Sequence, residues 1–248
     1  MSQEHVLITG AASGIGAATA RFLAPREGIL LTLIDRSETG LQDVAAGLGS
    51  ARVKMAAMDV ADPAAWQAMD MERALTGAVL CAGVSEVAPI AEMSFEAWRR
   101  VLAVNLDGAF LSLQAALRTC ADGASIVAVG SATGEKAAPM TAAYGASKAG
   151  LAQLVKVAGL EQAARGVRVN AIAPGGVKTP MFSNQEFFEG FKAEHGGEEG
   201  AWAALAGAVP LGRFAESDEI AAMIGFLLSD ASATMTGAVL KCDGGYGL

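Results

Sequence analysis

The chain opens with a short apolar segment that runs straight into a glycine-rich turn and then into a helical stretch. Residues 5–9 have the composition of a buried strand, residues 10–16 read Gly-Ala-Ala-Ser-Gly-Ile-Gly, and residues 17–23 favour a helix. Glycines let a backbone turn tightly and approach a ligand closely, and a helix amino terminus offers free N–H groups to a pyrophosphate. The spacing differs from the dinucleotide pattern Gly-x-Gly-x-x-Gly, and no Gly-Lys-Ser/Thr follows as in a P-loop. A purely structural turn remains the alternative, although its strand and helix context favours a phosphate site.

An acidic residue ends the second apolar segment. Residues 29–34 predict a buried strand, and Asp35 comes 19 residues after Gly16. Dinucleotide sites place a carboxylate about 20 residues beyond the glycine turn, where it accepts hydrogen bonds from the ribose of NAD. The same carboxylate repels the 2′-phosphate of NADP, so Asp35 favours NAD, whereas Arg36 would partly offset the repulsion. The alternative is that Asp35 only caps the next helix.

Strand-like and helical segments alternate along the rest of the chain. Apolar segments predict further strands at 52–58, 76–82, 125–130, 167–173 and 237–240, and Asp62-Pro63, Ser94 and Ser217 predict helix starts. This alternation predicts an α/β fold, with a mostly parallel, doubly wound sheet and helices on both faces in three layers. A length of 248 residues, without repeats or linkers, favours a single domain over residues 1–248.

Composition excludes several classes of function. Hydrophobic residues make up 52% of the chain and charged residues 18%, so the protein is globular, and a net charge of −8 without a basic cluster argues against nucleic acid or an anionic membrane surface. The three cysteines, Cys81, Cys120 and Cys242, show no metal spacing, and His5 and His195 lie far apart, so we expect no metal site. We expect Cys81 and Cys242 to be buried structural thiols. The polar start and the lack of a spanning segment predict a cytoplasmic protein.

Residues 94–119 predict one long helix, with Ser94 as its cap. Its large apolar residues recur at helical spacing, which predicts that they belong to the core: Phe95, Trp98, Leu102, Leu106, Phe110 and Leu113. Asn105 lies inside this helix, where asparagine is unfavourable. From composition alone we expect its side chain to be exposed or locally hydrogen-bonded.

A serine, a tyrosine and a lysine stand out around the fifth strand and the helix that follows it. Ser131 follows the apolar segment 125–130, and Tyr144 and Lys148 are four residues apart on a predicted helix, so they share one face. A phenol titrates near pH ~10, and a nearby ammonium is expected to lower its pKa, which would make Tyr144 a proton donor or acceptor near neutrality. Ser131 would hydrogen-bond the same substrate oxygen at the carboxyl end of its strand. Taken alone, the Tyr/Lys pair is more often an ordinary amphipathic turn.

The composition changes between residues 179 and 209. Phenylalanines and Trp202 alternate with glutamates and with the glycine breaks Gly196-Gly197 and Gly200. Such a segment is predicted to be a mobile lid over an apolar substrate, and a helical surface insertion that packs on the core or on a partner is equally consistent with it.

Several motifs together resemble the short-chain dehydrogenase/reductase family, over essentially the whole chain. The matching residues, in family order, are Thr9-Gly10-x-x-x-Gly14-Ile15-Gly16, Asp59-Val60, Ala82-Gly83, Asn105, Ser131, Tyr144-x-x-x-Lys148 and Pro174-Gly175-x-Val177-x-Thr179. The resemblance implies a single-domain, Rossmann-like fold of about 250 residues with a nicotinamide cofactor.

The resemblance also implies a role for each matching residue. Tyr144 would be the acid/base, Ser131 would orient the substrate oxygen, Lys148 would lower the tyrosine pKa and bind the nicotinamide ribose, and Asn105 would help to hold a water that relays protons. Asp59 and Val60 would contact adenine, and Val177 and Thr179 would contact the nicotinamide amide. The full set expected to bind cofactor is Gly10, Ser13, Gly14, Ile15, Gly16, Asp35, Arg36, Asp59, Val60, Ala82, Gly83, Tyr144, Lys148, Pro174, Gly175, Val177 and Thr179.

Two departures from the family pattern concern the cofactor loop. The family often has Asn-Asn-Ala-Gly where this chain has Leu80-Cys81-Ala82-Gly83, and Cys81 supplies no amide to support that loop. The segment between Asp59 and Cys81 is short for the family, so its helix should be truncated. Relatives that prefer NADP often carry a basic residue just before the second glycine, whereas this chain has Ser13, in agreement with Asp35.

The sequence therefore predicts an NAD-dependent oxidoreductase that interconverts a secondary alcohol and a ketone by hydride transfer. One alternative is an NADPH-dependent reductase of ketones or 3-oxoacyl thioesters, and another is a dinucleotide-sensing module without turnover. Enoyl reductases space their tyrosine and lysine further apart, which disfavours that activity. The family resemblance predicts a homotetramer, and small residues on the helix after Tyr144 (Ala149, Gly150, Ala152, Ala158 and Gly159) would allow close packing between subunits.

Overall fold

The segments anticipated as strands form one seven-stranded sheet in which every strand runs parallel to its neighbours. The computed structural model describes residues 4–248. The strands are β1 (His5–Thr9), β2 (Leu30–Asp35), β3 (Arg52–Ala57), β4 (Leu75–Leu80), β5 (Cys120–Val129), β6 (Arg168–Pro174) and β9 (Val239–Cys242). Their order across the sheet is β3-β2-β1-β4-β5-β6-β9. Strands β2 and β3 are added on one side of β1 and the later strands on the other side, so the strand order reverses between β1 and β4. A crevice at such a reversal is where open α/β sheets bind ligands.

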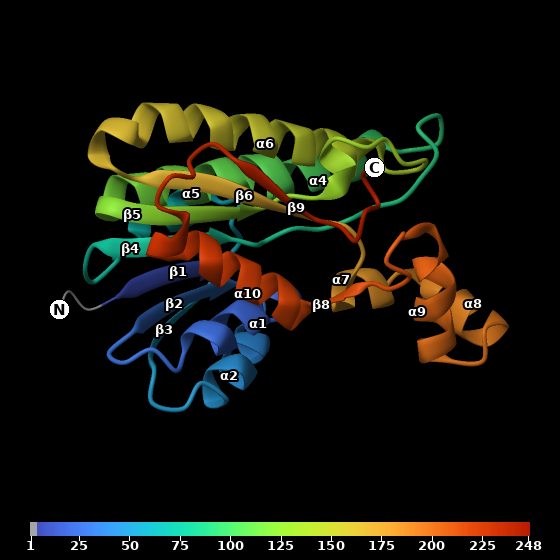
Figure 1. The fold of residues 1–248 in the computed structure, drawn as a ribbon, viewed down its shortest axis with the longest axis horizontal. Coiled ribbons are helices and arrows are strands. Elements are labelled where there is room, and N and C mark those ends of the chain that lie inside the picture. The colour runs from blue at the N-terminus through green and yellow to red at the C-terminus, as the bar shows by residue number, and fades with distance from the viewer. Residues whose placement is uncertain (1–3) are drawn as a thin grey trace.

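Helices cover both faces of the sheet, which confirms the three-layer α/β/α prediction (Figure 1). One face carries α1 (Gly14–Leu23), α2 (Glu38–Ala46) and α10 (Ser217–Leu228), and the other carries α3 (Pro63–Ala68), α4 (Phe95–Leu102), α5 (Ala109–Thr119) and α6 (Ala142–Gln162). The central strands are apolar on both sides because each side meets a helix layer, as in other parallel sheets. Ser94 and Asp62 cap α4 and α3 as predicted, and α3 spans only six residues, so that helix is short as expected.

The long helix predicted for residues 94–119 is interrupted by a π-helical segment, Ala103–Gly108, between α4 and α5. The prediction that six large apolar residues of this helix belong to the core is largely wrong. Phe95 and Phe110 are 76% and 45% exposed, and Leu113 is the one of the six that is buried. The face that meets the sheet instead carries mostly small side chains, namely Ala97, Val101, Asn105, Gly108, Ala109, Ser112 and Ala116. The reason is close approach, because a Cβ at Gly108 would lie 2.7 Å from Val60 Cγ2.

Three of the five small residues of α6 that were expected to allow packing between subunits pack within the chain, whereas Ala149 is exposed. A Cβ at Gly150 would lie 3.1 Å from the Leu106 side chain, and one at Gly159 would lie 2.8 Å from the backbone nitrogen of Gly237. Ala158 is buried in the same core as the sheet. These residues therefore give no support to the predicted tetramer, which stays a prediction.

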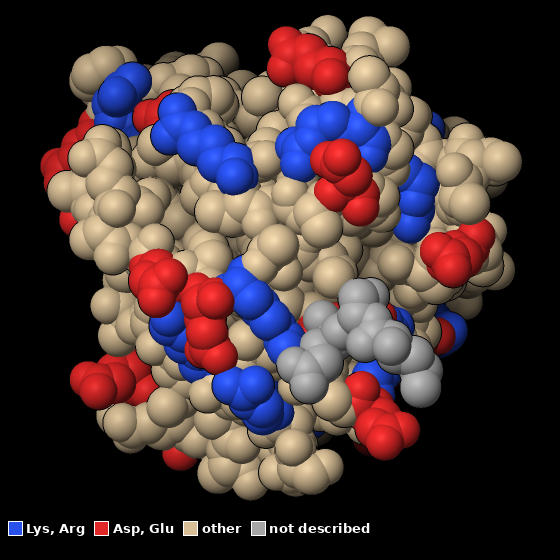
Figure 2. All heavy atoms as spheres, turned by 90° about the vertical axis from the view of Figure 1, so that its left-hand side faces the viewer, with Lys and Arg blue, Asp and Glu red and all other residues tan. Residues whose placement is uncertain are grey.

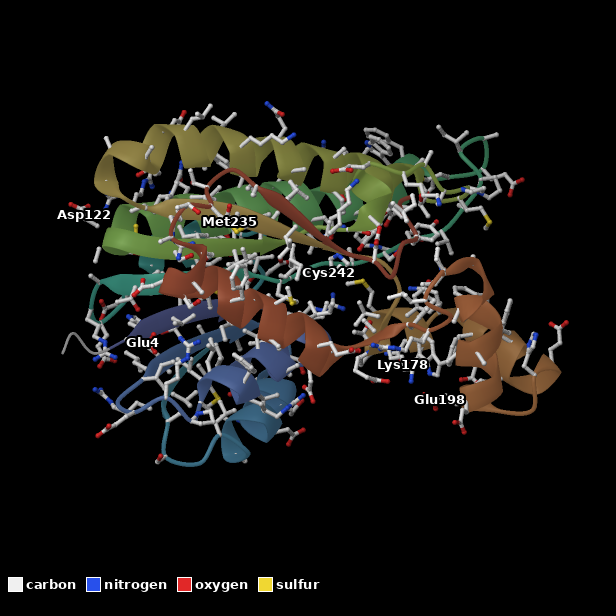
Figure 3. All side chains as sticks on the ribbon, in the orientation of Figure 1. Glu4, Asp122, Lys178, Glu198, Met235 and Cys242 are labelled. Carbon is white, nitrogen blue, oxygen red and sulfur yellow. The ribbon has the colours of Figure 1, made fainter. Side chains whose placement is uncertain are left out.

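The segment predicted as a lid is a helical unit that stands beyond the carboxyl ends of the strands. It contains α7 (Pro180–Ser183), α8 (Glu186–Glu194) and α9 (Glu198–Leu205), and Figure 1 shows α8 and α9 projecting from the body. A two-stranded sheet of β7 (Val177–Lys178) and β8 (Ala215–Glu216) joins its two ends, and Lys178 pairs with Glu216 at 2.6 Å. Figure 3 labels Lys178 at this junction and Glu198 on the projecting unit.

The opposite end of the molecule, at the amino ends of the strands, shows acidic and basic side chains interspersed (Figure 2). This mixed surface agrees with the absence of a basic cluster from the sequence. Within residues 4–248, no helix is both long and apolar enough to cross a membrane.

Candidate active site

A cavity of about 450 Å³ runs along the carboxyl ends of the strands, across the reversal between β1 and β4. Its walls contain almost every residue that the sequence singled out: Gly10, Ser13, Gly14, Ile15, Asp35, Arg36, Asp59, Val60, Ala82, Gly83, Ser131, Tyr144, Lys148, Pro174, Gly175, Val177 and Thr179. Gly16 and Asn105 lie behind the wall, where both are buried. Residues from segments far apart in the sequence therefore meet in one place.

The glycine-rich turn packs so closely that side chains would not fit. Gly10 has φ +66° and a Cβ there would lie 2.8 Å from the backbone of Ala82, while a Cβ on Gly16 would overlap the carbonyl oxygen of Gly10. Helix α1 begins at Gly14, and its N-cap Ser13 makes no side-chain capping bond. The amino end of α1 thus faces the cavity without a side-chain cap, as a phosphate site requires.

Asp35 holds the glycine turn and the start of α2 together. Its Oδ2 accepts a hydrogen bond from Ala12 N–H at 3.1 Å, and its Oδ1 accepts one from Ser37 N–H at 3.0 Å. The N-cap of α2 is Ser37, so the alternative that Asp35 merely caps this helix is wrong. A carboxylate offers about four acceptor positions, so two remain for a diol in the cavity.

At the far end of the cavity, Ser131, Tyr144 and Lys148 converge beneath the end of β5. Ser131 lies two residues beyond the end of β5, and Tyr144 and Lys148 occupy successive turns of α6, with Lys148 Nζ 5.6 Å from the centroid of the tyrosine ring. The Lys148 ammonium donates a hydrogen bond to the Val129 carbonyl at 2.8 Å and is 95% buried, since only 5% of the residue is exposed. The helical spacing read from the sequence thus brings the three side chains together.

The expected pKa shift of Tyr144 has the opposite sign in the structure. Burial raises the pKa of the Tyr144 phenol, and a hydrogen bond with Ser131 lowers it only in part. Burial also lowers the pKa of Lys148 to about 8. Removal of water disfavours the charged form of both groups, and the neighbouring ammonium does not offset this for the tyrosine.

Asn105 is completely buried and clamps two segments of the site, so an exposed side chain, one of the options from composition, is excluded. Its Oδ1 accepts a hydrogen bond from Val84 N–H at 2.8 Å, and its Nδ2 donates to Val84 O at 2.9 Å and to Ser147 Oγ at 3.1 Å. Ser147 in turn donates to the Tyr144 carbonyl at 2.7 Å. Both amide hydrogens of Asn105 are thus used within the chain, where they connect the loop after β4 to helix α6.

Cys81 stands where the family often has asparagine, and the loop is supported in another way. The hydroxyl oxygen of Thr9 accepts hydrogen bonds from the backbone N–H groups of Cys81 at 3.1 Å and Ala82 at 3.2 Å. As whole residues, Cys81 and Cys242 are partly exposed rather than fully buried. The Cys81 thiol itself is shielded from water, which raises its pKa to about 12. The thiol is therefore neutral and unreactive at physiological pH.

The sequence missed a further group of cavity residues. They are Met58, Val84, Ser85, Val104, Val129, Gly130, Pro180, Met181, Phe182, Asn184 and Gln185, in addition to Cys81. Several directly follow a strand end or a recognised motif, and that position was the available signal. Those on α7 and just after it could be found only once the chain had folded back over the cavity.

These residues fit a nicotinamide dinucleotide. The α1 amino end matches a pyrophosphate, and Asp35 retains acceptor positions for a ribose. Gly83 lies beside Lys148 and Met181, since a Cβ there would be 3.7 Å from Lys148 Nζ and 3.6 Å from Met181 Cε. Asp59 uses one oxygen to accept from Ala61 N–H, which leaves the other for a donor such as an adenine amino group.

Neither histidine belongs to a metal centre in residues 4–248. No group of three or more histidine, cysteine, aspartate or glutamate side chains there has the geometry to hold a metal ion. His5 is buried and contacts Thr32 Oγ1 at 2.8 Å and the Arg73 carbonyl at 3.0 Å, and His195 contacts the Phe191 carbonyl.

Comparison with known proteins identifies the family of the chain. A family model described as "Enoyl-(Acyl carrier protein) reductase" matches residues 10–247. The chain is 40% identical to cis-4-hydroxycyclohexanecarboxylate dehydrogenase of Sinomonas cyclohexanicum, over 99% of this chain and 97% of that protein. It is 42% identical to D-threitol dehydrogenase of Mycolicibacterium smegmatis, over 97% and 91% of the two chains. The chain belongs to the short-chain dehydrogenase/reductase family.

Structural similarity extends over the whole of this short-chain dehydrogenase/reductase. The crystal structure of levodione reductase matches with a TM-score of 0.88 and 31% identity, over 100% of this chain and 98% of that one. The family model carries the name of an enoyl reductase, whereas both relatives above are named dehydrogenases.

Proposed function

We propose that this short-chain dehydrogenase/reductase is an NAD-dependent enzyme that interconverts a secondary alcohol and a ketone, with Tyr144 as general acid/base. The observation that carries the proposal is one cavity lined by an uncapped helix terminus and Asp35 at one end and by Ser131, Tyr144 and Lys148 at the other. The relatives named for 4-hydroxycyclohexanecarboxylate and for threitol support an alcohol as the substrate.

Each residue of the catalytic end has a distinct task. The nicotinamide supplies a hydride acceptor or donor when it is bound. Ser131 and Tyr144 present two hydroxyls to a single substrate oxygen, which positions the carbinol carbon and lets the phenol exchange a proton with that oxygen. Lys148, fixed by the Val129 carbonyl, places a positive charge beside the phenol and offers its remaining N–H donors to a ribose.

Asp35 supports NAD over NADP. Its carboxylate lines the cavity at the end of β2, where it would repel a 2′-phosphate, and its position is fixed by two backbone N–H groups. Arg36 lines the same end and is exposed, so it can turn toward solvent without opposing that repulsion.

The test is NADH formation by the purified protein with a panel of secondary alcohols, with NADP assayed in parallel. We expect turnover with NAD, and Tyr144→Phe should abolish it while leaving the dissociation constant for NAD within a few-fold. Turnover with NADP alone would favour the NADPH-dependent ketone or thioester reductase. Tight NAD binding without conversion of any alcohol or ketone would favour the dinucleotide-sensing module, and substantial activity of Tyr144→Phe would refute the role of the tyrosine.

A further inference from the structure

The aromatic residues that suggested an apolar substrate pack mainly against one another. Phe188 and Trp202 are 1% and 8% exposed, their ring centroids are 4.5 Å apart, and they form a separate core with Ala201, Ala206, Val209 and Phe214. Phe191 joins that core from its edge and Phe187 stacks edge-on against Phe182. Among these phenylalanines and Trp202, Phe182 is the one that lines the cavity. The aromatic content of the segment therefore builds the projecting unit and says little about the substrate.

The side chains of this segment that line the cavity are partly polar. They are Met181, Phe182, Asn184 and Gln185, and the loop after β4 contributes Val84 and Ser85 to the same cavity. A Cβ at Gly83 would lie 3.6 Å from Met181 Cε, which places α7 close to the β4 loop.

Three of these polar side chains have unused hydrogen-bonding groups. Within residues 4–248, the Ser85 hydroxyl and the Asn184 amide make no hydrogen bond, and Gln185 uses only its Nε2, which donates to the Met181 carbonyl at 3.0 Å. Together they offer a hydroxyl, a complete amide and an amide oxygen. These are groups that recognise a hydroxyl or a carbonyl.

Along the described cavity wall, Lys148 is the cation at the catalytic end, and the proposed function already assigns it to the phenol and the ribose. The charged residues of the described cavity wall are Asp35, Arg36 and Asp59, which lie at the ends of β2 and β3, and Lys148, which already binds the Val129 carbonyl. The projecting unit adds negative charge through Glu198 and Glu199 in the first turn of α9, whereas Glu189 is paired with Lys192 at 2.6 Å. A carboxylate or a phosphate-bearing thioester would lose its hydration here without gaining an ion pair.

We propose that the substrate is a small uncharged alcohol that carries a second hydroxyl or a carbonyl group, bound by Ser85, Asn184 and Gln185. This inference rests on the proposed function, because it concerns the part of the substrate remote from the reacting carbon. Hydrogen bonds to these three side chains form only with a substrate that has a second polar group. They therefore favour such a substrate over secondary alcohols with a single hydroxyl.

A matched series of cyclic substrates tests the proposal. Initial rates with NAD would be compared for cyclohexanol, the 1,2-, 1,3- and 1,4-cyclohexanediols and 4-hydroxycyclohexanecarboxylate. We expect kcat/KM for at least one diol to exceed that for cyclohexanol about tenfold, as one or two neutral hydrogen bonds provide, and the carboxylate to be the poorest substrate. A carboxylate equal to or better than every diol would overturn the proposal.

Variants separate recognition from folding. Asn184→Ala removes an amide that has no partner within the described chain, so we expect kcat/KM for the preferred diol to fall about tenfold while kcat/KM for cyclohexanol and the KM for NAD stay within twofold. Gln42→Ala, on the exposed face of α2, is the control and should change none of these values. If Asn184→Ala lowers the values for cyclohexanol and diol equally, the proposed binding role is wrong.

The substrate inference and the proposed oxidoreductase function are contradicted by different results. Equal rates with cyclohexanol and every diol would overturn the substrate inference and leave the proposed oxidoreductase function standing. No conversion of any alcohol with either dinucleotide would overturn the proposed function and, with it, the substrate inference.

Discussion

Replacement of Asn105 by alanine tests whether its side chain positions the reacting residues. The wild-type amide makes three hydrogen bonds in a fully buried position, two to the Val84 backbone and one to Ser147 Oγ, at 2.8–3.1 Å. Ser147 Oγ in turn donates a hydrogen bond to the Tyr144 carbonyl at 2.7 Å, which connects Asn105 to the backbone of the tyrosine. Alanine therefore disconnects the loop after β4 from the turn of α6 that carries the tyrosine.

The expected loss of stability follows from the number of bonds. A buried neutral hydrogen bond contributes roughly 1 kcal/mol net, so three bonds give about 3 kcal/mol. In a domain of this size, each kcal/mol moves the melting temperature by about 2–4 °C, which predicts a decrease of about 6–12 °C. Misplacement of a reacting group by about 1 Å costs on the order of 100-fold in rate, so kcat should fall by about that factor.

Asn170→Ala is the matched control for this experiment. Asn170 is also fully buried and clamps a backbone loop, because its Nδ2 donates to Met235 O at 2.8 Å and its Oδ1 accepts from Ala238 N–H at 3.0 Å. It should lower the melting temperature by about 4–8 °C through two lost bonds, but leave kcat unchanged at a temperature where both variants are folded.

Thermal unfolding by circular dichroism and steady-state kinetics at 20 °C would decide the question. The reasoning is refuted if Asn105→Ala melts within 2 °C of the wild type, or if it loses stability as expected and keeps the wild-type kcat. The first result would mean that water replaces the clamp, and the second that the clamp only stabilises the fold.

Three further predictions follow from particular contacts. Asp35→Asn keeps the size of the side chain and removes the charge that repels a 2′-phosphate, so the ratio of kcat/KM for NAD to that for NADP should fall on the order of tenfold; an unchanged ratio would contradict the role of Asp35. Gly16→Ala places a Cβ against the Gly10 carbonyl, so NAD binding measured by calorimetry should be lost, and unaltered affinity would contradict the close approach. Burial lowers the pKa of His5, so its contribution to the free energy of unfolding is complete above pH 6.5 and lost as the pH falls toward the lowered pKa; a His5→Gln variant should show a flatter decline in urea unfolding between pH 7 and pH 5.

The sheet and the glycine turn could be predicted from the sequence because their signals are local. A parallel strand buried on both faces needs a short apolar run, and His5–Thr9 and Leu30–Asp35 are such runs, bounded by residues that turn the chain. The turn around Gly10 and Gly16 needs residues without Cβ atoms because its backbone touches that of Ala82 and of the turn itself. In each case the residue type is dictated by its own backbone position.

The helix that carries Asn105 could not be predicted in the same way because its environment is set by distant residues. Its large apolar residues were assigned to the core from their spacing, yet at Gly108 the close approach of Val60 leaves no room for a side chain, and most of the buried face carries small residues. Burial of an asparagine there requires partners on the loop at Val84 and on helix α6 at Ser147, which come together only in the folded chain. The same holds for Asn184 and Gln185, whose place in the cavity wall depends on how the chain folds back after β6.

The pair of Tyr144 and Lys148 shows how far spacing alone can reach, and it leads to a last prediction. Because they are four residues apart on a helix, the two side chains lie on the same face. Their pKa values depend instead on the exclusion of water, which raises the pKa of the Tyr144 phenol and lowers the pKa of the Lys148 ammonium to about 8. At neutral pH the tyrosine is therefore a protonated acid, suited to give a proton to a ketone, while alcohol oxidation needs the deprotonated form. We expect kcat/KM for oxidation to rise with pH through the alkaline range, and kcat/KM for ketone reduction to fall over the same range, in initial rates measured in both directions. An oxidation rate that is highest below pH 7 would show that another group accepts the proton.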